Sequence, residues 1–219
     1  MPAAALKKQF ESLLDGHLDW QSRPAPERVR TGISEVDVST GGLPRGCLTE
    51  IFGLPSSGRT SLLLAILAEA TARDEVCALV DAEDSFDPAS AAAAGVRLHR
   101  LLWVRCGHNA EHALKAADLL IQGGGFGLVA MDLCDTPNET ARRISLTSWF
   151  RLRRAVEHTP TVLLALARQS NAKTCASLML ECRRERTEWS GRLLRGIHVR
   201  VSSRHRSKSC SPVFMATAI

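Results

Sequence analysis

The feature that most constrains this sequence is Gly53–Thr60, which reads GLPSSGRT and lies between two runs of different character. Before it, CLTEIF (47–52) is typical of a buried strand, and after it, SLLLAIL (61–67) is typical of a helix. This setting distinguishes a real phosphate-binding loop from a chance match to G-x-x-x-x-G-K-[ST]. The glycines let successive N–H groups turn inward, and the following helix adds the partial positive charge of its N-terminus.

Arg59 stands where this loop pattern has a lysine. A guanidinium is planar and wider than an ammonium group, and it prefers bidentate contacts. The loop can still surround a triphosphate, but the side chain that contacts the γ-phosphate during transfer is changed from lysine to arginine. The sequence therefore supports nucleotide binding better than nucleotide hydrolysis.

Composition indicates a single globular domain. The chain has 219 residues, of which 45% are hydrophobic and 23% charged, enough for a sizeable core. No apolar run reaches the length of a membrane span, and residues 1–20 mix lysines with acids, so neither a membrane segment nor a signal peptide is expected. Seven cysteines without a C-x-x-C pair favour reduced thiols and a cytoplasmic location. Cys106, His108 and His112 lack a clear fourth ligand, so no metal site is predicted there.

Positive charge is concentrated near the end of the chain. Residues 183–208 hold nine Lys or Arg and two Glu, a local charge of +7 in a chain whose net charge is +5. Such a patch is typical of contact with an anionic partner such as nucleic acid, and a solvated basic surface is the open alternative. With no Tyr, six Phe and four Trp, a platform for stacking bases is not expected.

Apolar runs and turn residues predict an alternation of strands and helices. Expected strands cover residues 47–52, 76–81, 101–104, 126–132 and 161–167. Expected helices cover 1–19, the run from 61, 88–94, 111–122, and a stretch from Thr136 towards His158 in one or two pieces. Thr136 is expected as its N-cap, with Pro137 at the first helical position. Residues 29–46, with four glycines, are predicted to be loop and turn.

After residue 176 the pattern changes to alternation. The alternating apolar residues are Leu178, Leu180 and Cys182, then Ile197, Val199 and Val201, then Val213 and Met215. This alternation predicts antiparallel edge strands with one solvated face. The predicted fold class is α/β: a mostly parallel central sheet flanked by helices, with antiparallel C-terminal edge strands. Residues 1–27 are expected to form an N-terminal helix and linker, and residues 28–219 one core without a separate C-terminal domain.

Two acids follow expected strands at the edge where α/β proteins bind ligands. Asp132 ends the strand 126–132, where it would hold the shell of a Mg²⁺ ion together with the hydroxyl of Thr60. Glu83 lies just past the strand 76–81, where an acid can orient an attacking water. The alternative for Asp132 is a purely structural role as the cap of its strand. Asp81 and Asp84 are expected to be structural or solvated.

Several segments closely resemble the core of the bacterial RecA recombinase family. They are Thr31-Gly32, GGLPRG (41–46), EIFG (50–53), PSSG (55–58) and DAEDSFDP (81–88). The resemblance covers residues 28–219 and is strongly specific over 31–105. It implies a RecA-like P-loop NTPase core that uses ATP and Mg²⁺.

The resemblance also implies roles for individual residues. Nucleotide contacts would come from Gly53, Leu54, Pro55, Ser56, Ser57, Gly58, Arg59, Thr60 and Ser61, and from Asp87 at the adenine. Glu83 would activate water, Thr60 and Asp132 would bind Mg²⁺, and Gln169 would sense the γ-phosphate. Arg204, Arg206 or Lys208 would reach a neighbouring subunit's ATP or contact DNA.

Departures from the family pattern are informative. Besides Arg59, Ser90 stands where the family has a tyrosine stacked on adenine. The segment between Asp132 and Trp149 is too short for the first DNA loop, and residues 170–174 replace the long second loop. The chain is therefore similar in outline to the shortened RecA-like accessory proteins of translesion synthesis, the ImuA group.

Two functions are compatible with this pattern. The first is an ATP-binding protein of DNA repair, recombination or SOS mutagenesis that binds DNA, single-stranded DNA above all, with weak or absent DNA-dependent ATP hydrolysis. The second is a non-enzymatic module of the same fold that binds another repair protein or itself. Another P-loop role, such as a circadian-clock-type or helicase-like ATPase, is a third alternative.

Overall fold

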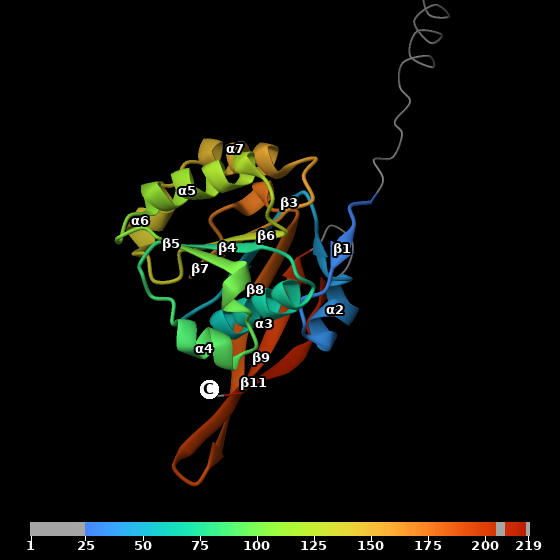
Figure 1. Ribbon diagram of the computed structural model, residues 1–219. Helices are drawn as coiled ribbons and strands as arrows, with labels where there is room; N and C mark the ends of the chain where they lie inside the picture. Colours follow the sequence, from blue (N-terminus) through green and yellow to red (C-terminus); the bar gives the residue numbers. More distant parts are fainter. Residues whose placement is uncertain (1–24, 205–208, 218–219) are drawn as a thin grey trace, which may run out of the picture.

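The computed structural model describes residues 25–204 and 209–217, arranged as a nine-stranded sheet with helices on both faces (Figure 1). The strand order is β10-β9-β8-β3-β7-β6-β4-β5, and β11 also pairs with β9. The helix expected over residues 1–19 lies outside the described residues. Within the described part of the chain, no helix has the length and apolar character needed to cross a membrane.

Six neighbouring strands form the parallel part of the sheet. They are β3 (Cys47–Phe52), β4 (Cys77–Asp81), β5 (Leu101–Arg105), β6 (Leu128–Asp132), β7 (Val162–Ala167) and β8 (Leu178–Ser190). Strands β4 and β7 are buried along their whole length, because helices cover both faces of the sheet. The predicted α/β class and the five predicted strands up to residue 167 are confirmed, with bounds that differ by one or two residues.

The helices divide into two layers. One face carries α2 (Ser34–Thr40), α3 (Arg59–Ala72) and α4 (Pro88–Ala93), and the other carries α5 (Ala110–Gly123) and α7 (Leu146–Val156) (Figure 1). The short helix α6 (Asn138–Arg143) precedes α7, and single 3-10 turns lie at Leu98–Arg100 and Lys173–Cys175. Each layer has its own hydrophobic core, with Leu62 in the first and Trp149 in the second.

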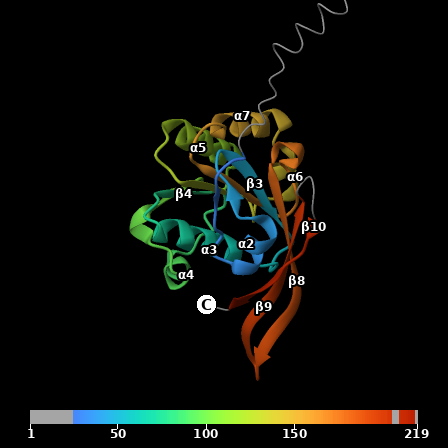
Figure 2. The ribbon, with the colours of Figure 1, turned by 90° about the vertical axis from the view of Figure 1, so that its right-hand side faces the viewer.

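The antiparallel end of the sheet contains β9 (Leu193–Arg204), β10 (Ser209–Cys210) and β11 (Val213–Thr217). Strand β8 is internal, since it pairs with β3 on one side and with β9 on the other. Past the body, β8 and β9 continue as a two-stranded ribbon (Figures 1 and 2). In β11 the predicted alternation has the wrong phase: Phe214 and Ala216 are buried and Met215 is half exposed, because pairing with β9 turns the even-numbered side chains towards the core.

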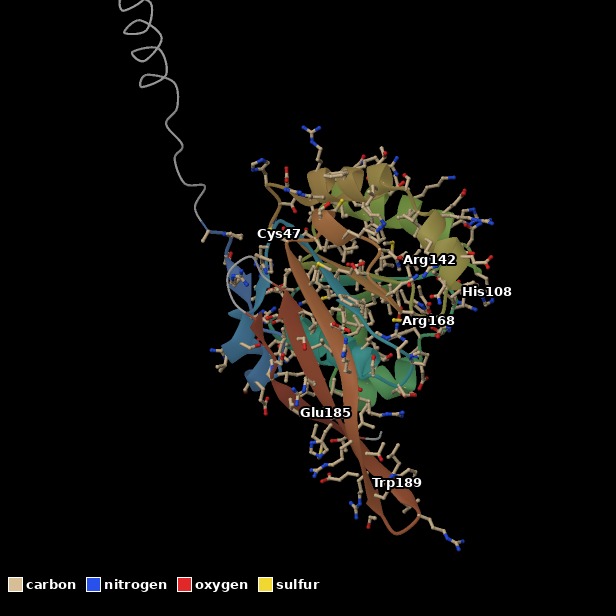
Figure 3. The ribbon with its side chains drawn as sticks, turned by 180° about the vertical axis from the view of Figure 1, so that it is seen from behind. Cys47, His108, Arg142, Arg168, Glu185 and Trp189 are labelled. Atoms are coloured by element: carbon tan, nitrogen blue, oxygen red, sulfur yellow. The ribbon has the colours of Figure 1, made fainter. Side chains whose placement is uncertain are left out.

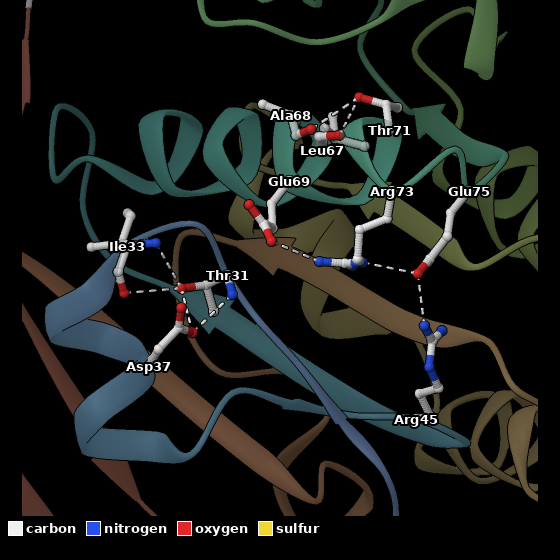
Figure 4. A network of polar contacts seen from close by, with 10 residues as sticks. All are labelled: Thr31, Ile33, Asp37, Arg45, Leu67, Ala68, Glu69, Thr71, Arg73 and Glu75. Atoms are coloured by element: carbon white, nitrogen blue, oxygen red, sulfur yellow. Dashed lines mark hydrogen bonds and ion pairs between the residues drawn. The ribbon is translucent and has the colours of Figure 1, made fainter.

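The prediction of loop and turn over residues 29–46 is wrong. Strands β1 (Arg28–Val29) and β2 (Leu43–Pro44) pair with each other, and α2 lies between them. Of the seven residues of α2 only Val36 is buried, so the segment has no helical apolar pattern to read. The N–H and hydroxyl of Thr31 both donate to Asp37 Oδ1 at 2.8 Å, which fixes the entry to α2 (Figure 4).

The expected cap at Thr136 is also wrong. Helix α6 begins at Asn138, Pro137 is its N-cap, and no side chain caps it. Thr136 is buried, and its Oγ1 has no hydrogen-bond partner in the described structure. A helix in two pieces is confirmed by α6 and α7.

An ion network joins three segments at the amino ends of the strands. Glu75 Oε1 accepts hydrogen bonds from Arg45 at 2.7 Å and from Arg73 at 3.1 Å (Figure 4). Burial raises the pKa of Glu75, but the two guanidinium groups outweigh burial and hold this pKa below its usual value. Gly127 lies so close that a Cβ there would be 2.1 Å from Glu75 Oε2. The network therefore closes the end of the sheet opposite the candidate site.

Candidate nucleotide-binding site

Parallel strands bring the predicted site residues to one edge of the sheet. The loop after β3, Gln169 after β7, Asp132 at the end of β6 and Glu83 after β4 all lie at carboxyl ends. Register pairs join Phe52 to Ala167, Leu166 to Asp132, and Asp132 to Asp81. With about 4.8 Å between strands, the step from β3 to β4 across β7 and β6 is about 14 Å. This is the edge at which open α/β sheets bind ligands.

The loop Gly53–Thr60 folds back on itself. Ser57 N donates to Leu54 O at 3.2 Å, and a Cβ on Gly53 would lie 2.7 Å from Ser57 Oγ and 2.2 Å from Cys182 O. Ser56 and Gly58 have left-handed backbones, with φ of 57° and 87°. Glycine is therefore required at position 53 by close packing and at position 58 by backbone conformation.

Two buried polar atoms in this loop lack partners. Ser57 Oγ and Arg59 Nη1 have no hydrogen bond in the described structure, although these residues are only 3% and 7% exposed. Buried donors are normally satisfied, so an acceptor is missing from this position. The 14-residue helix α3 begins at Arg59 with no side-chain cap, and its N-terminus adds partial positive charge. These observations fit an anion such as phosphate.

The charge of Arg59 acts on two cysteines from distant parts of the sheet. Burial raises the pKa of Cys182 on β8 to about 12, and the Arg59 charge acts in the opposite direction. Burial likewise raises the pKa of Cys134, which follows β6, and Arg59 again opposes it. Arg59 is therefore close to the turn after β6, where Asp132 lies. The six cysteines whose side chains the structure describes are all free thiols, as expected.

Asp132 is a half-buried carboxylate with a second acid beside it. Its Oδ1 accepts a hydrogen bond from Cys134 N at 2.8 Å. Burial raises its pKa, and the neighbouring charge of Asp81 raises it further. The described residues contain no group of three His, Cys, Asp or Glu able to hold a metal ion. A Mg²⁺ ion would thus depend on Asp132, the exposed hydroxyl of Thr60 and the phosphate oxygens.

Asp81 has a structural role, in line with expectation. One of its oxygens accepts hydrogen bonds from Phe86 N at 2.9 Å and from Trp103 Nε1 at 3.2 Å. Glu83 instead contacts His108, whose Nδ1 lies 3.0 Å from Glu83 Oε2. No sequence signal points to this contact, because His108 comes from the turn after β5, 25 residues further along the chain.

Asp87 is occupied as the N-cap of α4. Its oxygens accept hydrogen bonds from Ala89 N at 3.1 Å, from Ser90 N at 3.0 Å and from the Ser90 hydroxyl at 2.5 Å. The hydroxyl and the two N–H groups lower the pKa of Asp87. The serine that replaces the family's tyrosine therefore bonds to the residue predicted to contact adenine. The adenine contact of Asp87 itself remains a prediction.

Gln169 lies beside the phosphate loop. A cavity of about 500 Å³ is lined by Gln169, Arg168, residues 52–55, Ser57, and β8 residues that include Arg183 and Arg184. Arg142 of α6 donates to Gln169 Oε1 at 3.1 Å, and Gln169 Nε2 is buried without a partner. Arg168 donates through Nε to Cys134 O at 2.9 Å, so Arg142 and Arg168 both border this side of the site (Figure 3). The sequence singled out neither arginine.

Glu50 holds the chain that follows Gln169. This residue is fully buried in β3 and accepts three hydrogen bonds: from the Ser170 hydroxyl at 2.6 Å, from Asn171 N at 2.6 Å and from Ala172 N at 2.8 Å. The segment that replaces the second DNA loop of the resembled family is therefore short and tied to the core. An acid inside a buried strand needs a buried hydrogen-bond partner. The position of Glu50 in the expected strand 47–52 was therefore the sequence signal for such a contact.

The predicted basic residues lie partly beyond the described chain. Arg204 ends β9, where it pairs with Met179 of β8 and Ser209 of β10, while Arg206 and Lys208 are outside the described residues. Within the ribbon several arginines are neutralised: Arg183 contacts Glu181 at 2.7 Å, and Arg200 contacts Glu185. The local charge of +7 already subtracts Glu185, so of these two pairs only Arg183–Glu181 lowers it further.

Comparison with known proteins supports the same assignment. The family described as RecA N-terminal domain matches residues 11–139. A protein named Protein RecA from Rickettsia massiliae is 41% identical over 108 residues, 48% of this chain and 31% of the relative. Protein RecA of Deinococcus radiodurans is 42% identical over 106 residues, which cover 48% of this chain and 29% of the relative. Protein RecA of Fusobacterium nucleatum is 37% identical over 131 residues, which cover 59% of this chain and 34% of the relative.

The aligned segments span about a third of the length of these relatives. The family match includes the loop, Glu83, Asp87 and Asp132, whereas Gln169 and the basic strands lie outside it. A match over more than half of the chain, on a sheet with the expected strand and loop positions, decides the family: this chain belongs to the RecA N-terminal domain family.

Proposed function

We propose that this protein binds ATP with Mg²⁺ through the loop Gly53–Ser61 and acts in DNA repair or recombination, with DNA as its partner. Residues 28–219 would act as one core. ATP would supply the anion that Ser57 Oγ and Arg59 Nη1 lack, and Thr60 with Asp132 would hold the metal ion. Membership of the RecA N-terminal domain family supports the nucleotide and the DNA partner alike.

The observation that carries this proposal is the pair of unpartnered buried donors at the start of α3. Leaving such groups unpaired costs about 1–3 kcal/mol each, so a bound anion should be retained firmly. Arg59 serves as a donor buried under the loop. Glu83 would orient water, and its contact with His108 and the replaced lysine both favour slow hydrolysis.

Titration of a fluorescent ATP analogue, with and without Mg²⁺, tests the proposal. Saturable binding that Mg²⁺ strengthens is expected. Thr60→Ala should remove the Mg²⁺ effect, while Thr140→Ala, which deletes an exposed hydroxyl on α6, should leave it unchanged. Absence of saturation up to about millimolar nucleotide would refute nucleotide binding, because a working site supplies at least about 4 kcal/mol.

A non-enzymatic interaction module is the second candidate, and the state of Asp87 favours it. The carboxylate is already taken up by the cap of α4 and by Ser90. If base recognition is lost, the fold can still present a surface to another repair protein. Comparison of ATP with inorganic triphosphate separates the candidates: equal affinity for both would mean that the base contributes nothing, and a preference for ATP supports the first function.

A further inference from the structure

The end of the β8–β9 ribbon carries an exposed aromatic and aliphatic patch. Trp189 is 59% exposed, Leu193 is 74% exposed and Leu194 is 41% exposed. Trp189 and Leu194 are directly opposite each other, so their side chains share one face of the ribbon, and Leu193 lies on the other. These three residues are called the ribbon tip. Apolar side chains of this size are unusual at the end of an element that projects into solvent.

The ribbon tip stands clear of the rest of the molecule. Strand β8 pairs with β3 only as far as Glu181, and β11 pairs with β9 only as far as Gly196. Nine residues separate Glu181 from Ser190 on β8, about 30 Å of strand. Glu188 of β8 is opposite Gly196, so the residues of both strands from this pair to the turn extend beyond β11. Figure 3 places Trp189 near the end of this ribbon, far from Arg142 and Arg168. A partner can therefore approach the tip without contacting the helices.

The tip is closed by a tight turn. Ser190 pairs with Leu193, which leaves Gly191 and Arg192 as a two-residue turn, and Gly191 has φ of 61°. A glycine with positive φ at the first turn position is typical of a tight β-hairpin. The Trp189 indole N–H donates to Thr187 Oγ1 at 3.0 Å, which fixes the ring while its faces stay accessible. A ring that is already fixed loses little side-chain entropy when it stacks.

Free positive charge surrounds the tip. Arg183, Arg186 and Arg200 have acid partners on the same ribbon: Glu181, Glu188 and Glu185. Among the residues that the structure describes, Arg184, Arg192 and Arg195 are exposed and form no ion pair. Arg192 occupies the turn itself, and Arg195 is the unpaired residue of a bulge next to the Trp189–Leu194 pair. Of the three, Arg192 and Arg195 therefore place free charge beside the aromatic ring, whereas Arg184 lines the cavity near Gly53.

We infer that the ribbon tip is a stacking platform for single-stranded DNA. Trp189 would stack on a base, Leu194 would contact the same base, and Arg192 and Arg195 would contact flanking phosphates. An unpaired base offers the π-face that this patch needs, whereas the bases of a duplex are already stacked. The inference rests on the proposed DNA partner and places the contact on the ribbon. It differs from the expectation, drawn from the low aromatic content, that a base-stacking platform is not evident.

The sheet edge near Gln169 supports this location. Glu50 ties residues 170–172 to β3, so that segment cannot extend around a strand of DNA. The turn after Asp132 leads within a few residues into α6. Of the surfaces that the structure describes, the ribbon is the one that combines reach, an exposed aromatic ring and unpaired arginines.

Binding of an oligothymidylate to the full chain, followed by tryptophan fluorescence and by anisotropy of a labelled strand, tests the inference. The measurement uses a Trp20→Phe background, because Trp20 lies outside the described residues. Quenching of Trp189 is then expected, since Trp149 is buried and Trp103 packs against Phe86. Trp189→Ala should weaken binding about 5- to 150-fold with an unchanged salt slope, because it removes stacking and no charge. Trp189→Phe should recover part of the affinity and abolish the quenching.

Arginine variants give the complementary result. Arg192→Ser with Arg195→Ser should flatten the log–log salt dependence by about 0.7 for each phosphate of single-stranded DNA that is no longer neutralised. The charge-matched control is Arg143→Ser with Arg154→Ser, on α6 and α7, which should not change the slope. A slope change of equal size in the control would overturn the assignment of phosphate contacts to the tip.

The outcomes separate the inference from the proposed function. If the wild-type chain binds DNA and Trp189→Ala binds equally well, the stacking platform is refuted and the DNA partner remains. A tip that serves a protein partner would give this same result. If the wild-type chain binds no single-stranded DNA, the proposed DNA partner fails together with the inference. Circular dichroism of each variant verifies that the ribbon change leaves the fold intact.

Discussion

Val199 of β9 lies against Gly58 of the phosphate loop, so closely that a Cβ added to Gly58 would be 2.3 Å from Val199 Cγ2. The strand that leads to the ribbon thus forms a wall of the candidate phosphate site. Arg59, the next residue, is buried beneath the same contact. Substitutions in β9 should therefore alter the loop, and substitutions in the loop should alter β9.

We expect Gly58→Ala to lower the melting temperature and weaken nucleotide binding. A residue with a Cβ at φ of 87° costs about 1–2 kcal/mol, and the clash with Val199 adds to this. Thermal denaturation and nucleotide titration measure the two effects. Gly107→Ala is the matched control, because Gly107 has φ of 60° and nothing within 4 Å of the added Cβ.

The contact itself is isolated by a second change. Val199→Ala in the Gly58→Ala background should restore part of the stability, since it removes the methyl groups that the new Cβ meets. If Gly58→Ala is no more harmful than Gly107→Ala, the coupling between β9 and the loop is not real.

Glu50→Gln should destabilise the protein by about 3 kcal/mol. The carboxylate is fully buried and accepts three hydrogen bonds, and an amide cannot accept all of them. Urea denaturation measures the loss, and faster hydrogen exchange at the amides of Asn171 and Ala172 would locate it. Glu69→Gln, which removes a carboxylate paired with Arg73 on the surface of α3, should cost at most about 1 kcal/mol. Similar losses for both variants would contradict the role given to Glu50.

Stability should depend on Glu75 in a pH-dependent way. Its folded pKa is below 4.5, because hydrogen bonds from Arg45 and Arg73 outweigh burial. The stabilisation is therefore complete above pH 4.5 and is lost as pH falls through the lower folded pKa. Glu75→Gln should reduce the free energy of unfolding by about 1–2 kcal/mol at pH 7, and the gap to wild type should narrow below pH 4.5.

Urea denaturation at several pH values measures this gap. Glu27→Gln is the control, because Glu27 is 75% exposed and lies 3.6 Å from Arg45. It should change stability little at any pH. A gap for Glu75→Gln that is constant from pH 7 to below pH 4.5 would show that the carboxylate is not held in its charged form.

The sequence predicted those parts of the fold in which local pattern and tertiary structure agree. The runs 76–81 and 161–167 are apolar on both faces, which is possible only for strands covered on both sides, so β4 and β7 were predictable. The loop that begins at Gly53 was equally predictable. Its two glycines are required locally, Gly53 by close packing and Gly58 by its positive φ. By contrast, α2 buries only Val36, and its seven residues carry no periodicity that distinguishes a helix from a turn.

Three of the site contacts that were missed join residues distant in sequence. Arg142 meets Gln169 across 27 residues, His108 meets Glu83 across 25, and Glu50 meets Asn171 across 121. Such contacts depend on strand register and on rotamers. The hydrogen bond of Ser90 to Asp87 is local, and a serine three residues after an aspartate N-cap was the available signal. The sequence thus located the edge of the sheet and the loop, while the partners of Glu83, Gln169 and Asp87 required the structure.

Arg59→Lys should raise ATP hydrolysis. In the present protein the guanidinium is buried with one nitrogen unpaired, near Cys134 and Cys182, and a planar group of this width cannot occupy the position of an ammonium at a transferred phosphate. Phosphoryl transfer is accelerated by charge placed where negative charge develops, so the smaller and more mobile lysine should bring the rate up.

Steady-state phosphate release by wild type and Arg59→Lys measures the change, with Glu83→Gln as the blank in each background. An increase of about tenfold corresponds to about 1.4 kcal/mol of transition-state stabilisation. Nucleotide affinity measured alongside separates a change in hydrolysis from a change in binding. If Arg59→Lys hydrolyses ATP at the wild-type rate or more slowly while binding is kept, arginine is the adapted residue at this position. The loop would then be built to hold nucleotide, and the unpaired nitrogen of Arg59 would be the donor that holds it.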